Sequence, residues 1–251
     1  MVQRYFVKED QWDNQTVVIH GEDVHHIGRV MRMEPGDTII CIRSDQVIAE
    51  CRITDISSDE VTCHIESWIS EDRELPVFVS IVQSLGKGDK LEQVIQKGTE
   101  LGAYRFIPFK ADRSISKWDD KKAEKKIQRL QKIAKEASEQ SQRTHIPVIE
   151  NASTIKEVMA MGETFDAKVF AYENEAKTAE FHSLASHLET INAGDHVLVV
   201  IGPEGGFSER EVNTLYDHGF QSFRLGRRIL RMETAPLYYL SSVSYQFEEL
   251  R

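Results

Sequence analysis

The sequence has few cysteines and no long apolar run, and each shortage excludes a class of protein. Its three cysteines, Cys41, Cys51 and Cys63, are an odd number without a Cys-x-x-Cys pair, which favours small buried side chains of a reduced protein over disulfides or a zinc site. The longest aliphatic run spans only residues 197–201, whereas a transmembrane helix needs about 20 residues. The first ten residues include charged side chains and lack the apolar segment of a secretory signal. The cytoplasm is therefore the expected location, and no membrane partner is predicted.

Basic charge is also in short supply, because 31 Lys and Arg face 41 Asp and Glu, for a net charge of −10. A uniformly basic nucleic-acid coat is therefore excluded, and a polyanion would have to meet a local patch. The segment 117–145 has nine basic against five acidic residues, although much of this charge is expected to be a solvated helix face. The residues predicted to follow a phosphate backbone stand near loop ends or in the N-terminal part: Arg4, Arg29, Arg32, Lys87, Lys90, Arg113 and Arg143.

The first 66 residues favour short β-strands, with one helical candidate at residues 22–32. Spacing of this kind predicts a small barrel or sandwich. Residues 67–75 are mostly polar and precede Pro76, which makes them the expected linker. The sequence thus predicts a small β domain over residues 1–72.

From residue 73 to 251 the pattern changes to alternating strands and helices, among them the apolar segment 196–201 and a long helix at about 119–143. This alternation predicts an α/β domain with a mostly parallel sheet that is covered by helices on both faces. Ligands of such sheets bind beyond the carboxyl ends of the strands. Three of these ends are unusual.

The first unusual strand end is the sequence IGPEGGFSERE, in which Gly202, Gly205 and Gly206 precede a helix. Glycines let a backbone approach a ligand closely, and the helix amino terminus offers N–H groups. Ser208 and Glu211 form a predicted capping box. A cofactor loop and a turn that needs positive φ angles explain these residues equally well.

The other two strand ends carry charged side chains. The stretch LGRRILRMETAP places Arg227, Arg228 and Arg231 near Glu233, and grouped arginines can clamp carboxylates or phosphates. For Arg227 a solvated basic loop is the preferred interpretation. Tyr172 ends the third strand, directly before Glu173, which alone is a weak signal.

Several catalytic motifs are absent. The turn with Gly86 and Gly88 does not complete G-x-G-x-x-G, and no P-loop, H-E-x-x-H or G-x-S-x-G motif occurs. These absences argue against most nucleotide-binding, zinc-protease and serine-hydrolase chemistry, and no metal site is predicted. An enzyme that binds ATP or NAD at the Gly86 turn stays an alternative.

Four stretches together resemble a known family: SLGKGDKLEQVIQKGTELG, EQSQR (139–143), IGPEGGFSERE and LGRRILRMETA. In this order they look like the signatures of the ribosomal RNA small-subunit methyltransferase E family of the SPOUT superfamily, and the likeness covers essentially the whole chain. The resemblance implies an enzyme that methylates N3 of a uridine in 16S rRNA, using S-adenosylmethionine, on the assembled 30S subunit.

The resemblance also implies structure and site residues. Residues 1–72 would form a PUA-like β-barrel that binds RNA, and residues 73–251 a SPOUT methyltransferase domain with a trefoil knot at roughly 166–251, in a homodimer. The cofactor contacts carried over by motif are Ala171, Tyr172, Glu173, Ile201, Gly202, Glu204, Gly205, Leu225, Gly226, Ile229, Leu230 and Arg231.

The expected reaction needs a base and a cation, because uridine N3 is protonated at neutral pH and negative charge spreads onto O2 and O4 when it is removed. Glu233 or Glu204 is the candidate base, and Arg231 or a partner subunit's copy of Arg143 the candidate cation. Glu233 can equally be an anchor for its loop. A non-catalytic RNA-binding or ribosome-assembly protein is the alternative function, and it would not need the glycine-rich strand ends.

Overall fold

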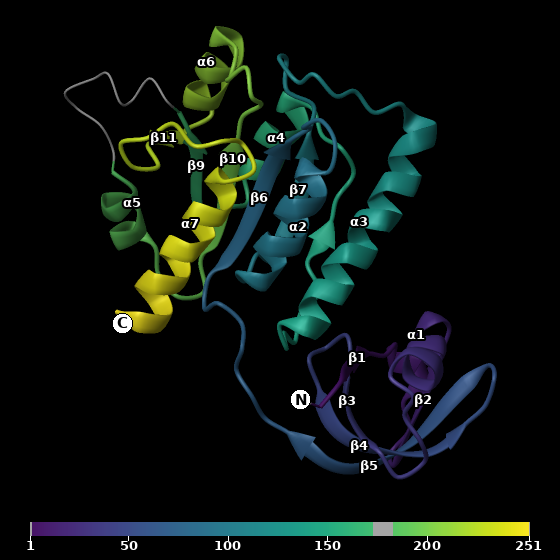
Figure 1. The fold of residues 1–251 in the computed structure, drawn as a ribbon. Coiled ribbons are helices and arrows are strands. Elements are labelled where there is room, and N and C mark those ends of the chain that lie inside the picture. The colour runs from purple at the N-terminus through teal and green to yellow at the C-terminus, as the bar shows by residue number, and fades with distance from the viewer. Residues whose placement is uncertain (1, 173–182, 251) are drawn as a thin grey trace. The chain divides into compact units, whose positions relative to one another are not determined.

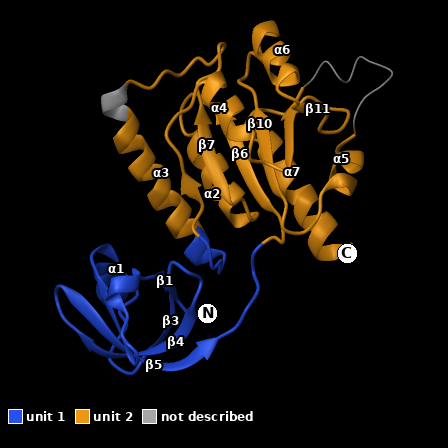
Figure 2. Ribbon diagram, turned by 180° about the vertical axis from the view of Figure 1, so that it is seen from behind, with its two compact units in different colours: residues 1–74, 138–145 blue, residues 75–137, 146–251 orange. Residues whose placement is uncertain are grey.

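The computed structural model describes residues 2–172 and 183–250 (Figure 1), with the backbone alone for residues 120–122. The chain divides into two compact units, shown in different colours in Figure 2. Unit 1 comprises residues 1–74 and 138–145, and unit 2 comprises residues 75–137 and 146–251. Each unit has its own hydrophobic core.

Unit 1 is a curled five-stranded sheet with the order β1-β3-β4-β5-β2, in which β1 pairs with β3 in parallel and the other pairs are antiparallel. The predicted helix forms as an α-helical turn followed by a π-helical turn. The elements are β1 (Arg4–Phe6), η1 (Glu9–Gln11), β2 (Thr16–His20), α1 (Glu22–His25), η2 (His26–Val30), β3 (Thr38–Ile42), β4 (Ile48–Ile56) and β5 (Glu60–Ile69).

The three cysteines lie in the core of this sheet, as predicted. Cys41, Cys51 and Cys63 are buried free thiols on β3, β4 and β5. Hydrogen bonding to the other two thiols, together with burial, raises the pKa of Cys41 well above its usual range. Cys41 therefore remains protonated, and the three buried side chains pack as small apolar groups.

The predicted linker at residues 67–75 begins too early. Strand β5 continues to Ile69, because Ser67, Trp68 and Ile69 pair with Glu50, Ala49 and Ile48 of β4. The side chains at this end of β5 do not alternate between buried and exposed, and Trp68 is 56% exposed. Backbone pairing with a neighbouring strand extends β5 where the pattern of side chains does not.

Unit 2 is a six-stranded sheet with the order β11-β9-β10-β6-β7-β8, and every pairing between its strands is parallel. This confirms the predicted α/β class. The elements are β6 (Phe78–Ser84), α2 (Lys90–Glu100), β7 (Arg105–Phe109), α3 (Asp120–Gln140, whose last three residues belong to unit 1), β8 (Val148–Ile149), α4 (Ile155–Gly162), β9 (Ala167–Ala171), α5 (Leu184–Thr190), β10 (His196–Ile201), α6 (Glu209–Asp217), β11 (Gln221–Phe223), α7 (Ala235–Ser244) and η4 (Tyr245–Glu249).

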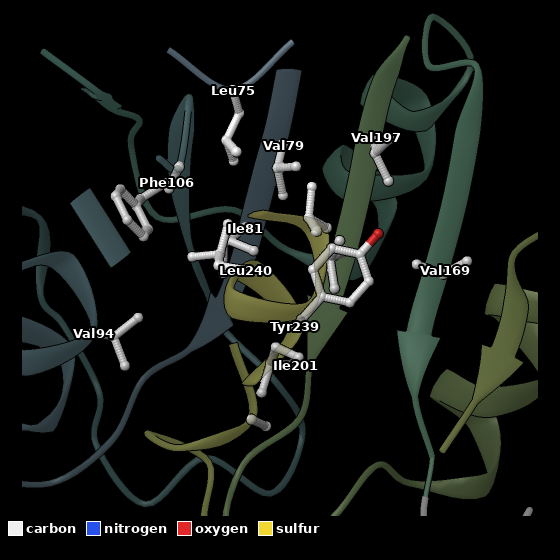
Figure 3. Close-up of a cluster of buried hydrophobic side chains, with 14 of the residues drawn as sticks. Leu75, Val79, Ile81, Val94, Phe106, Val169, Val197, Ile201, Tyr239 and Leu240 are labelled. Carbon is white, nitrogen blue, oxygen red and sulfur yellow. The ribbon is translucent and has the colours of Figure 1, made fainter. Parts of the chain in front are cut away.

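Helices cover both faces of this sheet, because successive side chains of a strand point to opposite sides. Along β10, Val197 and Val199 belong to a core shared with α2, α3, α5 and α7, whereas Leu198 and Val200 belong to a core shared with α4 and α6. Figure 3 shows Tyr239 of α7 within the first of these cores. Fully burying such aliphatic side chains contributes about 1.5–3 kcal/mol each.

Candidate active site

Three neighbouring strands end at the same edge of the sheet in unit 2. Strands β11, β9 and β10 are adjacent and parallel, so their carboxyl ends at Phe223, Ala171 and Ile201 lie next to one another. The connections that follow these ends are the three that the sequence singles out. In an open α/β sheet this edge is where ligands bind.

The glycine-rich connection after β10 is held by close packing. A Cβ atom on Gly202 would lie 3.0 Å from the ring of Phe207, a side chain that is 6% exposed. Gly206 has a φ of 68°, which favours glycine. Ser208 then caps α6, and its capping box with Glu211 is present as predicted. The loop therefore uses its glycines for a close approach and a left-handed turn.

The described residues of these strand ends and connections surround a cavity of about 680 Å³, a volume typical of small-molecule sites. Every residue assigned to the cofactor by resemblance lines it except Glu173, which lies outside the described residues. The lining residues of that set are Ala171, Tyr172, Ile201, Gly202, Glu204, Gly205, Leu225, Gly226, Ile229, Leu230 and Arg231.

An ion-pair cluster joins two of the loops to α2. The Nζ atom of Lys90 lies 2.8 Å from Oε1 of Glu204 and 3.5 Å from Oε2 of Glu233. The hydrogen bond to Glu204 raises the pKa of Lys90. Burial opposes ionisation of Glu204, but the hydrogen bond from Lys90 and its charge lower the pKa of this carboxyl overall. Both groups are therefore charged at neutral pH.

The cavity lining is strongly cationic although the chain is acidic. Six of its lining residues are basic and two are acidic, whereas the whole chain has a net charge of −10. The basic members are Lys90, Arg113, Arg224, Arg227, Arg228 and Arg231, and the acidic ones are Glu204 and Glu209. This concentration provides the local patch that an anionic substrate requires.

The predicted catalytic residues have different surroundings in the structure. Glu204 and Arg231 line the cavity. Glu233 is not among the lining residues, and its side chain is 17% exposed beside Lys90. Arg143 belongs to unit 1, where its buried guanidinium pairs with Glu74.

Glu74 explains why Arg143 has this position. Its carboxylate accepts hydrogen bonds from Nε of Arg143 at 3.0 Å and from the backbone N–H groups of Thr144 and His145 at 2.8 and 3.1 Å. Arg143 is 3% exposed, so its guanidinium has almost no surface with which to contact RNA or a substrate. The structure gives this side chain a buried ion pair within unit 1. Its catalytic and RNA-binding roles stay predictions.

The other predicted RNA-binding residues fall into three groups. Lys90 and Arg113 line the cavity, and Arg113 donates to the backbone carbonyl of Gly205 at 3.1 Å. Lys87, Arg29 and Arg32 are exposed.

Arg4 forms the third group. It is 8% exposed and forms an ion pair with Glu71. Its role in RNA binding stays a prediction.

The sequence does not indicate helix α5, yet a side chain of this helix packs against a residue of the cavity lining. His187 of α5 is buried, its Nε2 atom lies 2.9 Å from the hydroxyl of Tyr239, and its ring stacks on Phe223 at 5.8 Å. Phe223 lines the cavity. Burial lowers the pKa of His187 to about 4. The only sequence signal for this helix is Ser183, whose side chain caps it.

Other lining residues were not among the predicted cofactor contacts. Pro203, Gly206, Phe207, Glu209, Arg227, Arg228, Met232 and Ala235 stand inside the recognised motifs, and Phe223 and Arg224 directly precede the motif LGRRILRMETA. The turn with Gly86 and Gly88, the alternative nucleotide site, is not part of the cavity lining. A Cβ on Gly86 would lie 3.1 Å from the sulfur of Met232, so this glycine allows close packing. Among the described residues no cluster of His, Cys, Asp and Glu is placed to hold a metal ion, and no described helix is long and apolar enough to cross a membrane.

Family models match both parts of the chain. One described as an RNA methyltransferase domain matches residues 73–244, and one described as an RNA methyltransferase PUA domain matches residues 19–66. The chain is 47% identical to ribosomal RNA small subunit methyltransferase E of Bacillus subtilis (strain 168), covering 100% of this chain and 99% of that protein. It is 30% identical to the protein of the same name from Synechocystis, covering 99% of this chain and 79% of that one.

Solved structures show the same similarity. The ribosomal RNA small subunit methyltransferase E of Neisseria gonorrhoeae bound to S-adenosyl methionine gives a TM-score of 0.85 at 27% identity, covering 98% of each chain. A putative methyltransferase of Legionella pneumophila in complex with the bound cofactor SAM gives 0.86 at 27% identity, also covering 98% of each. With matching family models and a full-length relative at 47% identity, this chain belongs to the ribosomal RNA small subunit methyltransferase E family of RNA methyltransferases.

Proposed function

We propose that this chain transfers a methyl group from S-adenosylmethionine to N3 of one uridine in 16S rRNA. The observation that carries the proposal is the cavity at the ends of β9, β10 and β11, because a glycine-rich loop, a carboxylate and several arginines meet there. The bound cofactor named for the Neisseria and Legionella structures supports the choice of methyl donor.

The residues of the cavity suit S-adenosylmethionine. Ile201, Phe223 and Leu225 offer apolar surface for an adenine ring, and residues 202–206 bring the backbone to the cavity wall. Glu204 and Glu209 offer negative charge to a cationic ligand. When bound, the cofactor would supply a methyl group on a positively charged sulfur, so the protein's main contribution is to position the acceptor.

Glu204 is the proposed base that accepts the proton from uridine N3. It lines the cavity and is ionised, whereas Glu233 is not among the lining residues. Glu233 lies near Lys90, which holds Glu204 at 2.8 Å. We therefore assign to Glu233 the anchoring role that the sequence left open.

Arg231 is the proposed cation. It lines the cavity, is exposed, and has no ion pair within the described part of the chain. A guanidinium beside the acceptor would stabilise the negative charge that develops on O2 and O4 of the uracil ring.

The proposed target is uridine 1498, and the proposed substrate is the assembled 30S subunit. The names of the relatives support ribosomal RNA of the small subunit as the substrate class. We place the reaction in the cytoplasm, where ribosomal subunits are made and where three free thiols stay reduced.

We propose that residues 1–72 form an RNA-binding PUA-like domain and residues 73–251 the catalytic domain, with a trefoil knot at roughly 166–251. The exposed Arg29 and Arg32 would contribute to RNA binding by the first domain. The strand order supports the knot. Strand β10 lies between β9 and β6, and the next strand, β11, lies on the other side of β9. Helix α7, which follows β11, packs against β10.

A homodimer is proposed through the outer face of α7. Tyr238 and Tyr245 are seven residues apart on this helical segment and are 40% and 58% exposed. The hydroxyl of Tyr238 lies 3.8 Å from the position of a Cβ on Gly226, a cavity residue. A second copy seated on this face would therefore contact a cofactor loop, and sedimentation of the purified chain would report the dimer.

The test is methyl transfer to 30S subunits from cells that lack this enzyme. With methyl-labelled S-adenosylmethionine, nucleoside mass spectrometry should find 3-methyluridine at one position. Glu204→Gln should slow the reaction by at least about 100-fold, as expected for loss of a general base, and Glu209→Gln, a matched charge change in the same cavity, should slow it much less. Label on cytidine or guanosine refutes the assignment, and RNA binding without methylation favours a binding protein.

A further inference from the structure

Residues 227–231 present an unusual combination of exposed side chains at the cavity. Arg227, Arg228 and Arg231 are exposed, and none of them has an ion pair among the residues that the structure describes. Between them, Ile229 is 75% exposed. Gly226, with a φ of 76°, turns the chain directly before this segment.

Most other arginines of the described chain are neutralised. Eight of them pair with a carboxylate, and these are Arg4, Arg43, Arg52, Arg73, Arg105, Arg129, Arg143 and Arg210. The chain has ten more acidic than basic residues, so carboxylates are in excess over the cations that could pair with them. Adjacent cations without an acidic partner repel each other, so their cluster is best explained by an external anion.

We infer that Arg227 and Arg228 form a phosphate clamp that holds the RNA backbone on either side of the target nucleotide. This inference rests on the proposed function. An enzyme that modifies a base must take that nucleotide out of its stack and into the active site. The base would then enter the cavity while its flanking phosphates stay outside, within reach of exposed lining side chains such as these two.

Arginine suits this contact because its planar guanidinium donates paired N–H bonds to phosphate oxygens. The contact carries no base specificity, since every nucleotide has the same phosphate. Arg231 differs from the clamp in its proposed role, because we assign it to the acceptor ring. The clamp therefore contributes affinity and positioning for RNA, and Glu204 and Arg231 provide the chemistry.

The experiment measures binding of the full chain to 30S subunits from cells that lack this enzyme, at several salt concentrations. Each phosphate contact contributes about 0.7–0.9 to the slope of log affinity against log salt. The double variant Arg227→Gln/Arg228→Gln should thus reduce the slope by about 1.4–1.8 and weaken binding about 30-fold at about 0.1 M salt. Arg129→Gln is the matched control, because this arginine is 69% exposed on α3 and pairs with Glu92.

Calorimetry with S-adenosylmethionine separates the clamp from a cofactor role. The double variant should lose much less affinity for the cofactor than for RNA, and Arg227→Lys/Arg228→Lys should restore most of the salt slope. A wild-type slope in the double variant overturns the clamp, and so do equal losses of cofactor and RNA affinity. If the wild-type chain itself neither binds nor methylates the subunits, the proposed function falls, which is a distinct result.

Discussion

The buried His187 should make stability depend on pH in a defined window. Burial lowers its pKa from 6.5 to about 4 in the folded chain. Because the unfolded chain binds the proton more readily, this neutral histidine contributes stability that is fully present above pH 6.5 and is lost as the pH falls toward 4. At 1.36 kcal/mol per pKa unit, the total is about 3 kcal/mol, of which about 2 kcal/mol is lost between pH 7 and pH 5.

The assay is urea unfolding of the wild type and of His187→Gln at both pH values. Other titrating groups are common to both proteins, so the difference in their pH dependence isolates this side chain. The wild type should lose about 2 kcal/mol more than the variant on going from pH 7 to pH 5. Cofactor affinity should change little through His187 over this range, because its imidazole stays neutral in the folded chain until the pH approaches 4.

Equal losses of stability in the two proteins would refute the reasoning. If the variant does not fold, an NMR titration of His187 in the wild type gives the same answer directly. A titration near 6.5 would mean that the imidazole is solvated and not held neutral beside Tyr239.

Three further changes have expected outcomes. Gly202→Ala should lower stability by about 1–3 kcal/mol and weaken cofactor binding in calorimetry, because its Cβ would lie 3.0 Å from the buried Phe207 ring. Lys90→Gln removes the hydrogen bond that lowers the pKa of Glu204, so the acidic limb of the methylation rate should move to higher pH. Glu74→Ala removes the carboxylate that pairs with the buried guanidinium of Arg143, which should lower the free energy of unfolding in urea by about 3–5 kcal/mol.

Each change has a matched control. Gly205→Ala places its Cβ at an ordinary 3.4 Å from Arg113 and should be milder than the Gly202 change. Lys97→Gln removes an exposed pair with Glu100 on α2 and should leave the pH profile unmoved. Glu66→Ala removes a surface pair, where about 0–1 kcal/mol is at stake. Indistinguishable results within any of these comparisons would contradict the corresponding argument.

The elements that sequence predicts well are those with strong local signals. The apolar segment 196–201 becomes the buried strand β10, and Ser208 with Glu211 caps α6 as expected. Helix α5 escapes prediction because only seven residues form it, and only His187 and Leu188 of these are buried. So short a helix shows no apolar period.

Local motifs indicate most residues of the cavity lining, whereas contacts between residues far apart in the chain leave no signal in the sequence. The three strand ends come from motifs within one loop each. The pair of Lys90 with Glu204 joins residues 114 positions apart, and the pair of Arg143 with Glu74 spans 69 positions. Periodicity and spacing carry no signal for such contacts. The sequence therefore predicts that Lys90 and Arg143 contact RNA, whereas the structure pairs each of them with a carboxylate.

The placement of β10 between β6 and β9 has a consequence for how the enzyme is made. The candidate cavity takes Lys90 from α2 but most of its lining from residues 171–172 and 201–235. A nascent chain therefore has no complete cavity until almost its entire length has been synthesised, and a product that stops before β11 would have none. Pairing strands so far apart in sequence is also intrinsically slow, so newly made molecules should acquire donor binding only after release from the translating ribosome.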